Sequence, residues 1–188
     1  MSEPLVVVGN GMAAARLVDE LTKRAQGRYA IAVVGDEPRL AYNRVLLSSV
    51  LAGETASHDI ELKPAGWWRE RGVTLKYGCL ATEIDVGRRE LKIANEENIA
   101  FSRLVIATGS TPLRLNVPGA DLAGVHTFRD SRDVDLLLTL AAQKKRVVVV
   151  DTSCWSEGGR STRTWSSTNL RSRSCESALR SFFDKPRQ

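Results

Sequence analysis

Two glycines and an alanine near the N-terminus, Gly9, Gly11 and Ala14, have the spacing Gly-x-Gly-x-x-Ala. They follow the apolar run of residues 5–8 and precede a helical pattern over residues 12–23. In a strand–turn–helix of this kind, Gly9 permits the tight turn, Gly11 lets the backbone approach a pyrophosphate, and Ala14 keeps the helix near the strand. The start of the helix attracts phosphate groups. The spacing therefore predicts a dinucleotide-binding turn.

An acidic side chain is expected at the end of the next strand. Residues 29–34 form a second apolar run, which ends at Gly35, Asp36 and Glu37. An acid at this place can accept hydrogen bonds from a ribose diol. Asp36 and Glu37 compete for the role. The alternative is an ordinary strand–helix–strand unit whose turn binds nothing.

The remaining pattern predicts the elements that must position these residues. Residues 38–48 are expected to form a loop that runs into a short helix ending near Gly53, and a second short helix is expected over residues 65–71. A strand is expected over residues 73–77, and buried strands are expected over residues 104–107 and 147–150. Residues 81–85 and 90–94 alternate apolar and polar side chains, which predicts an antiparallel pair turning at residues 87–89. A helix is expected over residues 130–142, with Val134, Leu137, Leu138 and Ala141 on one face.

Charge and cysteine content argue against several classes of protein. The formal net charge of +5 divides into +2 over residues 1–150 and +3 over residues 151–188, which gives no case for nucleic-acid binding by the main body. There is no signal-peptide pattern and no apolar run of membrane-spanning length. The cysteines Cys79, Cys154 and Cys175 form no metal-ligand or disulfide pattern. We expect a cytoplasmic protein that binds neither nucleic acid nor membrane.

Other chemically notable side chains receive structural interpretations. Cys79 has no partner at Cys-x-x-Cys spacing, so a half-buried structural thiol is expected. Trp67 and Trp68 are assigned to core packing, with at least one pointing inward. His58 and His126 are isolated and receive no role. We name no metal ligand and no catalytic acid, base or nucleophile.

Four separated motifs then follow one another in a familiar order. They are the Gly9–Ala14 turn, the acid Glu37, Tyr-Asn-Arg-Val-Leu-Leu-Ser at residues 42–48, and Ala-Thr-Gly-Ser-Thr-Pro at residues 107–112. Over residues 5–150 the chain thus resembles the FAD-dependent pyridine nucleotide–disulfide oxidoreductase superfamily. Val-Pro-Gly-Ala-Asp at residues 117–121 and His-Thr-Phe-Arg at residues 126–129 make it most similar to the N-terminal flavoprotein part of NAD(P)H–nitrite reductases.

The resemblance implies a Rossmann-like α/β fold that binds FAD. Gly9, Gly11, Met12, Ala13 and Ala14 would surround the FAD pyrophosphate, and Glu37 would hold the adenosine ribose. Arg44 would pair with a phosphate or lie near the flavin, since its guanidinium suits phosphate oxygens. Ala81 would present its backbone to the adenine. Ala107, Thr108 and Gly109 would close over the cofactor.

The same resemblance implies how a complete enzyme would work. NAD(P)H delivers hydride to the flavin, and electrons then leave singly for a metal centre. In nitrite reductases an iron–sulfur cluster and sirohaem lie in later domains, which this chain lacks, together with the segment that returns to the FAD domain. We therefore expect a fragment with weak FAD affinity and little turnover. The alternatives are a ferredoxin or rubredoxin reductase-like flavoprotein and a non-catalytic nucleotide-binding module.

Three regions are expected. Residues 1–115 would form the FAD-binding domain, with a parallel sheet and a small antiparallel meander. Residues 116–150 would begin an incomplete NAD(P)-binding domain. Residues 151–188, with nine serines and six arginines, would be an aberrant or disordered tail, and the rival interpretation is a basic arm for nucleic acid or an acidic partner.

The start of this tail suggests a change of reading frame. In the family, a strand like residues 147–150 runs into a second glycine-rich turn, but here it meets Asp-Thr-Ser-Cys-Trp. Read one base out of phase, the Cys-Trp codons give leucine followed by a codon starting with G. The Asp-Thr codons give His or Tyr, preceded by a possible Gly. The shifted frame permits Gly-His-x-Leu-Leu, close to the missing turn, and we hypothesise that residues 151–188 are frameshifted.

Overall fold

The computed structural model describes residues 2–112, 114, 116–143, 147–150 and 162–165. The chain divides into two compact units, which are described separately. Unit 1 comprises Met1–Arg44 and Ile60–Leu113, and unit 2 comprises Val45–Asp59 and Arg114–Gln188. The chain thus leaves unit 1 after Arg44 and returns to it at Ile60.

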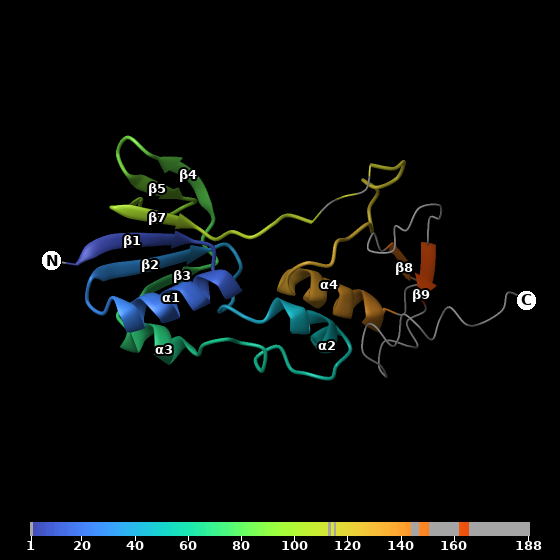
Figure 1. Cartoon of the computed structure of the whole chain (residues 1–188). Coiled ribbons are helices and arrows are strands. Elements are labelled where there is room, and N and C mark those ends of the chain that lie inside the picture. The colour runs from blue at the N-terminus through green and yellow to red at the C-terminus, as the bar shows by residue number, and fades with distance from the viewer. Residues whose placement is uncertain (1, 113, 115, 144–146, 151–161, 166–188) are drawn as a thin grey trace, which may run out of the picture. The chain divides into compact units, whose positions relative to one another are not determined.

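Unit 1 is built on a four-stranded parallel sheet in the order β3-β2-β1-β7 (Figure 1). These strands are β1 (Glu3–Val8), β2 (Tyr29–Gly35), β3 (Thr74–Tyr77) and β7 (Arg103–Ile106). The helix α1 (Met12–Arg24) connects β1 to β2, and α3 (Ala65–Glu70) precedes β3. This order is that of half a doubly wound dinucleotide-binding fold.

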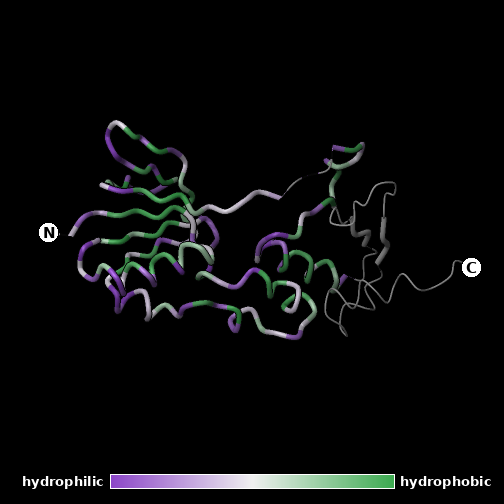
Figure 2. The backbone as a smooth tube through the Cα atoms, viewed as in Figure 1, coloured by the Kyte–Doolittle hydropathy of each residue, from purple (hydrophilic) through white to green (hydrophobic). Residues whose placement is uncertain are grey.

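Both faces of the central strands β1 and β2 are buried, which explains their continuous apolar runs. Leu5 and Val7 on one face pack with Ala14, Ala15 and Val18 of α1. On the opposite face, Val6 and Val8 pack with Leu91 and Ile93. Figure 2 shows these hydrophobic stretches along the strands. The alternation follows from the two-residue period of a strand.

The second face is covered by a three-stranded antiparallel sheet in the order β4-β5-β6. Its strands are β4 (Ala81–Asp85), β5 (Glu90–Ile93) and β6 (Ile99–Ala100). Arg89 adopts a positive φ of 56° in the turn between β4 and β5. The expected meander is therefore present, as is the expected parallel sheet.

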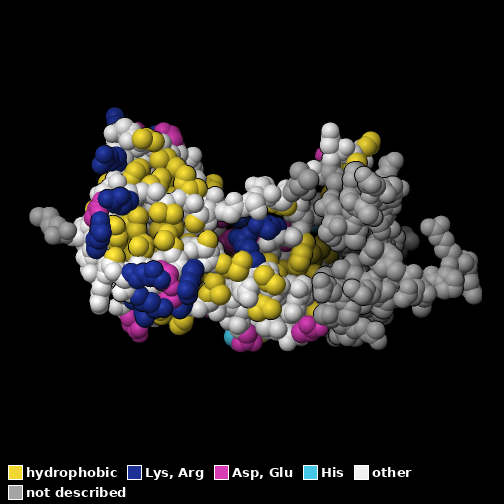
Figure 3. Space-filling model, viewed as in Figure 1, with side chains coloured by type: hydrophobic (Ala, Val, Ile, Leu, Met, Phe, Trp, Pro, Cys, Tyr) yellow, Lys and Arg dark blue, Asp and Glu magenta, His cyan; other side chains and the backbone are white. Residues whose placement is uncertain are grey.

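Charged side chains on α1 form ion pairs along the helix. Arg16 and Arg24 both contact Glu20, and Lys23 contacts Asp19, all at a spacing of four residues. Figure 3 shows the resulting mixture of basic and acidic side chains.

Of the adjacent tryptophans, Trp68 is buried in the core and Trp67 packs edge-on against it, as expected.

Unit 2 contains the helices α2 (Leu47–Leu51) and α4 (Ser131–Ala142), which contact each other. A 3₁₀ turn, η1 (Arg44–Leu46), leads into α2. The Asp130 side chain caps α4 by accepting from the backbone N–H groups of Arg132 and Asp133. The expected helix is therefore present, and on the expected face Val134 is buried whereas Leu138 is 41% exposed.

The strand β8 (Val147–Val150) pairs antiparallel with β9 (Thr162–Trp165). The rest of the expected tail, residues 151–161 and 166–188, lies outside the described residues. The division into an FAD domain and the start of an NAD(P) domain stays a prediction. In the described part of the chain, we find no helix that is both long and apolar enough to cross a bilayer.

Candidate functional site

Gly9 lies where the C-terminal ends of three parallel strands meet. Its backbone N–H donates to the Val34 carbonyl of β2 at 2.7 Å, and the N–H of Ala107 donates to the Val8 carbonyl at 2.7 Å. Gly9 has a φ of +110°, and a β-carbon built there would lie 2.3 Å from the Ala107 carbonyl oxygen. A side chain at Gly9 would therefore collide with backbone that follows β7.

The N-terminus of α1 begins directly after this crossing. Gly11 is the N-cap residue, and no side chain caps the helix. A β-carbon on Gly11 would meet nothing within 4 Å, and Met12 and Ala13 are exposed. Because the first N–H groups of a helix lack intrahelical partners, this open end is suited to bind an anion. Ala14 is fully buried against β1, as the motif requires.

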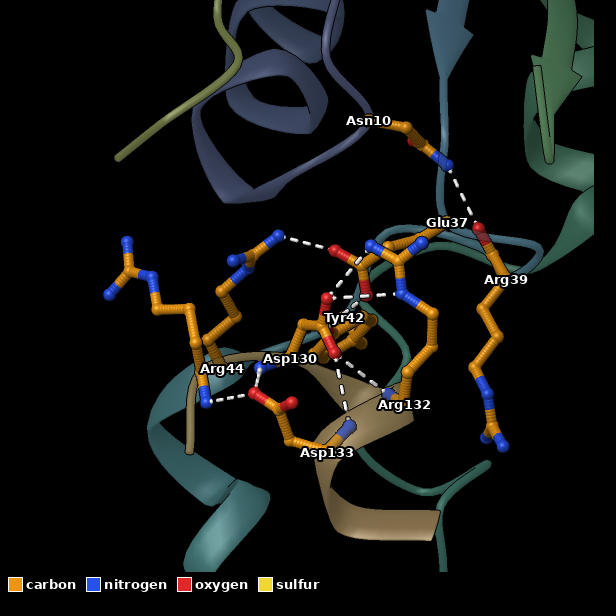
Figure 4. Close-up of polar contacts among 9 residues, drawn as sticks. Asn10, Glu37, Arg39, Tyr42, Arg44, Asp130, Arg132 and Asp133 are labelled. Atoms are coloured by element: carbon orange, nitrogen blue, oxygen red, sulfur yellow. Dashed lines mark hydrogen bonds and ion pairs between the residues drawn. The ribbon is translucent and has the colours of Figure 1, made fainter. Parts of the chain in front are cut away.

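Glu37 follows β2 and is buried, with 7% of its surface exposed. The Tyr42 hydroxyl donates to its Oε2 at 2.5 Å, and the Arg44 guanidinium donates to its Oε1 (Figure 4). We call these three residues the Glu37 cluster. The two predicted ligands Glu37 and Arg44 are thus brought together, but Arg44 is engaged with a carboxylate.

Asn10 connects the glycine turn to the loop that contains Glu37. Its Nδ2 donates to the Arg39 carbonyl at 3.0 Å (Figure 4). A β-carbon built on Gly35 would lie 2.5 Å from the Asn10 β-carbon, so Gly35 leaves room for Asn10. We predicted no role for Asn10, Gly35 or Tyr42. Asn10 lies inside the glycine motif, but the motif does not predict its bond to Arg39. Tyr42 lies two residues before Arg44, but that motif does not predict its bond to Glu37.

The other predicted residues lie at or near the same edge of the sheet. Ala107, Thr108 and Gly109 follow β7 beside Gly9, and Gly109 has a φ of +77°. Ala81 begins β4 after a turn whose Gly78 and Cys79 N–H groups donate to the Glu37 and Gly35 carbonyls at 3.0 and 2.8 Å. In open α/β sheets, ligands bind at the carboxyl ends of the strands.

Cys79 is half-buried, and its thiol donates to Glu96 at 3.1 Å. This hydrogen bond and the burial of the thiol raise the pKa of Cys79. The Lys76 ammonium also donates to Glu96, at 2.6 Å, and holds the pKa of that carboxyl below its ordinary value. A raised thiol pKa disfavours the reactive thiolate, so Cys79 fits the structural interpretation. Over the described residues, no group of three or more His, Cys, Asp or Glu side chains could hold a metal ion.

Comparison with known proteins adds an independent finding. A family model described as pyridine nucleotide-disulphide oxidoreductase matches residues 3–150. The match therefore covers both glycine-rich segments of the candidate site and ends at the last residue of β8.

Two curated relatives come from Bacillus subtilis (strain 168). The assimilatory nitrate reductase electron transfer subunit is 37% identical over 146 residues, and so is the nitrite reductase [NAD(P)H]. Each alignment covers 78% of this chain. The chain spans 19% and 18% of the length of these relatives.

Among solved structures, the putidaredoxin reductase–putidaredoxin complex is similar with a TM-score of 0.65 and 26% identity. That match covers 74% of this chain and 34% of the matched chain. The relatives found by sequence and the solved structure found by fold are thus all named as reductases or as part of one.

Proposed function

The chain belongs to the pyridine nucleotide-disulphide oxidoreductase family, and from this membership we propose that unit 1 binds the ADP half of FAD. The chief support is the juxtaposition of an uncapped α1 N-terminus with an acid at the end of β2. A pyrophosphate would lie against Gly9, Gly11, Met12, Ala13 and Ala14, where the open space at Gly11 admits it. Glu37 would accept hydrogen bonds from the ribose diol.

The remaining predicted residues complete the proposed site. Ala81 would offer backbone groups to the adenine, and Ala107, Thr108 and Gly109 would lie beside the cofactor. Arg44 belongs to the site through its bond to Glu37. When FAD is bound, it supplies the acceptor for hydride from NAD(P)H and releases electrons singly. The residues described in the chain bind and orient the cofactor, and we assign none of them to proton transfer.

We propose further that this chain is part of a nitrite reductase-type flavoprotein of the cytoplasm. The nitrite and nitrate reductase relatives support this type, because they are more identical to the chain than the putidaredoxin reductase. The electron acceptor would be an iron–sulfur or sirohaem domain or a separate redox protein. The second candidate is a ferredoxin reductase-type flavoprotein. It is favoured by the ferredoxin–NAD(+) reductase component of Paraburkholderia xenovorans (strain LB400), 33% identical over 80% of this chain and 36% of its own length.

Absorbance spectroscopy tests the proposal on the purified 188-residue chain. On titration with FAD, we expect a saturable change in the flavin absorbance spectrum and little NADH-driven dye reduction. A chain that binds ADP but causes no change in the flavin spectrum would instead support a non-catalytic nucleotide-binding module. Rapid NADH-driven dye reduction would contradict the expected low turnover.

A further inference from the structure

We propose that Tyr42 and Arg44 are positioning residues, which act on the nucleotide through Glu37. The inference rests on the proposed function, in which Glu37 accepts hydrogen bonds from the ribose diol. It assigns a role to Tyr42 and makes Arg44 a partner of the acid instead of a phosphate ligand. It also makes recognition of the diol a property of the whole Glu37 cluster.

The first support is the geometry of the carboxylate. Tyr42 donates to Oε2 at 2.5 Å, whereas Arg44 donates to Oε1. The Arg44 guanidinium carbon also lies 5.8 Å from the centroid of the Tyr42 ring, within the range of a cation–π contact. Because the two donors bind different oxygens, they restrict rotation of the carboxylate about its terminal bond. A single donor would leave that rotation freer.

The second support is burial. Glu37 is 7% exposed and Tyr42 is 5% exposed, so their hydrogen bond is shielded from water. A buried carboxylate is costly unless it is paired and hydrogen-bonded. Arg44 supplies the opposite charge, and Tyr42 supplies a second donor. Both partners therefore stabilise the buried Glu37 carboxylate, as water stabilises an exposed one.

The third support is the backbone that holds Tyr42. Tyr42 forms an isolated antiparallel bridge with Glu61. The flanking bonds are Asn43 N–H to the Ile60 carbonyl and Leu62 N–H to the Ala41 carbonyl, each 2.8 Å long. Ile60 is almost fully buried. The backbone of Tyr42 is thus paired with the segment that returns to unit 1 at Ile60.

A measurable consequence concerns nucleotides with and without the ribose hydroxyls. A fixed, charged acceptor strengthens binding only when a diol is present, so it raises the affinity for ADP over 2′,3′-dideoxyadenosine diphosphate. We expect the full chain to prefer ADP by roughly tenfold or more, as for hydrogen bonds to a charged group. Removing the Tyr42 hydroxyl or the Arg44 charge lets the carboxylate reorient, and the preference declines.

Calorimetric titration of the full chain with both nucleotides tests this inference. Tyr42→Phe and Arg44→Gln should each lower the ADP preference by about threefold or more, with dideoxy-ADP affinity nearly unchanged. The matched control is Tyr29→Phe at the opposite end of β2, which should keep the preference. Thermal unfolding followed by circular dichroism checks that each variant is folded.

The outcomes separate the two proposals. If the unaltered chain binds neither ADP nor FAD, the proposed function fails and this inference fails with it. If the unaltered chain prefers ADP and both variants keep the full preference, only the inference is overturned. An equal loss of affinity for both nucleotides in the folded variants would also overturn it, because a merely structural role has that effect.

Discussion

The backbone at Gly9 lies so close to Ala107 that a β-carbon on Gly9 would come within 2.3 Å of the Ala107 carbonyl oxygen. Gly9 also has a φ of +110°, which L side chains rarely adopt. The glycine is therefore required by the fold itself, independently of any ligand. The contact joins the ends of β1 and β7, the two segments that contribute glycines to the candidate site.

Gly9→Ala should consequently destabilise the protein. We expect the free energy of unfolding to fall by about 2–4 kcal/mol, from steric overlap and backbone strain together. Denaturant unfolding followed by circular dichroism measures this change. Stability within about 0.5 kcal/mol of the unaltered chain would contradict the close approach.

Gly11→Ala is the matched comparison, because the space around Gly11 is open. It should lower stability by at most about 1 kcal/mol, the usual cost of alanine at an N-cap. FAD binding should nevertheless weaken by roughly tenfold or more, since the methyl group would occupy the approach of the pyrophosphate. A variant that binds FAD normally would show that Gly11 does not face the ligand.

Gly35→Ala should also be destabilising, by about 1–3 kcal/mol, because its β-carbon would lie 2.5 Å from the Asn10 β-carbon. Asn10→Gly removes that neighbour. In an unfolding double-mutant cycle, Gly35→Ala should therefore cost less in the Asn10→Gly background. Additive effects would refute a direct contact between the two positions.

These glycines illustrate what sequence pattern can predict. The strands of the parallel sheet were predictable, because burial on both faces requires uninterrupted apolar runs such as residues 5–8. The glycine spacing likewise predicted the turn into α1. The contact between Gly35 and Asn10 was not predictable, since it depends on how two loops pack.

The contacts within the Glu37 cluster were likewise not predictable from the sequence. Glu37 and Arg44 were chosen from motifs, but their mutual bond was not foreseen. The orientation of Tyr42 depends on a short bridge to Glu61, within a mixed, polar stretch that has no strand pattern. The residue types therefore indicated a dinucleotide ligand. The partners of Glu37 could be identified only from the tertiary structure.

Asp19 should make stability depend on pH. The Lys23 ammonium, at 2.9 Å, holds the pKa of the Asp19 carboxyl below its ordinary value, and Lys63 and Arg16 contribute. A depressed pKa stabilises the fold above the unfolded value of about 3.9, and this contribution is lost as pH falls through the folded pKa.

Urea unfolding between about pH 7 and pH 3 measures this effect. Asp19→Asn should reduce the acid-side loss of stability, whereas Asp121→Asn, at an exposed position, should not. Identical pH profiles for the unaltered chain and Asp19→Asn would contradict the assignment.

The reading-frame hypothesis makes a prediction about the gene. The family match ends at residue 150, where a second glycine-rich turn was expected. Sequencing across codon 150 should reveal that an alternative frame encodes Gly-His-x-Leu-Leu or a close variant, followed by the rest of an NAD(P)-binding domain. An alternative frame without such a continuation would disprove the hypothesis.

Calorimetric titration with FAD tests the central claim most directly. The unaltered chain should bind FAD saturably and in competition with ADP. Glu37→Gln should weaken binding by roughly tenfold or more, because the charged acceptor for the diol is lost. Glu20→Gln, which removes a carboxylate paired with Arg16 on α1, should leave the affinity unchanged. The claim would be contradicted by a chain that does not bind FAD, or by a folded Glu37→Gln variant that binds it as tightly as the unaltered chain.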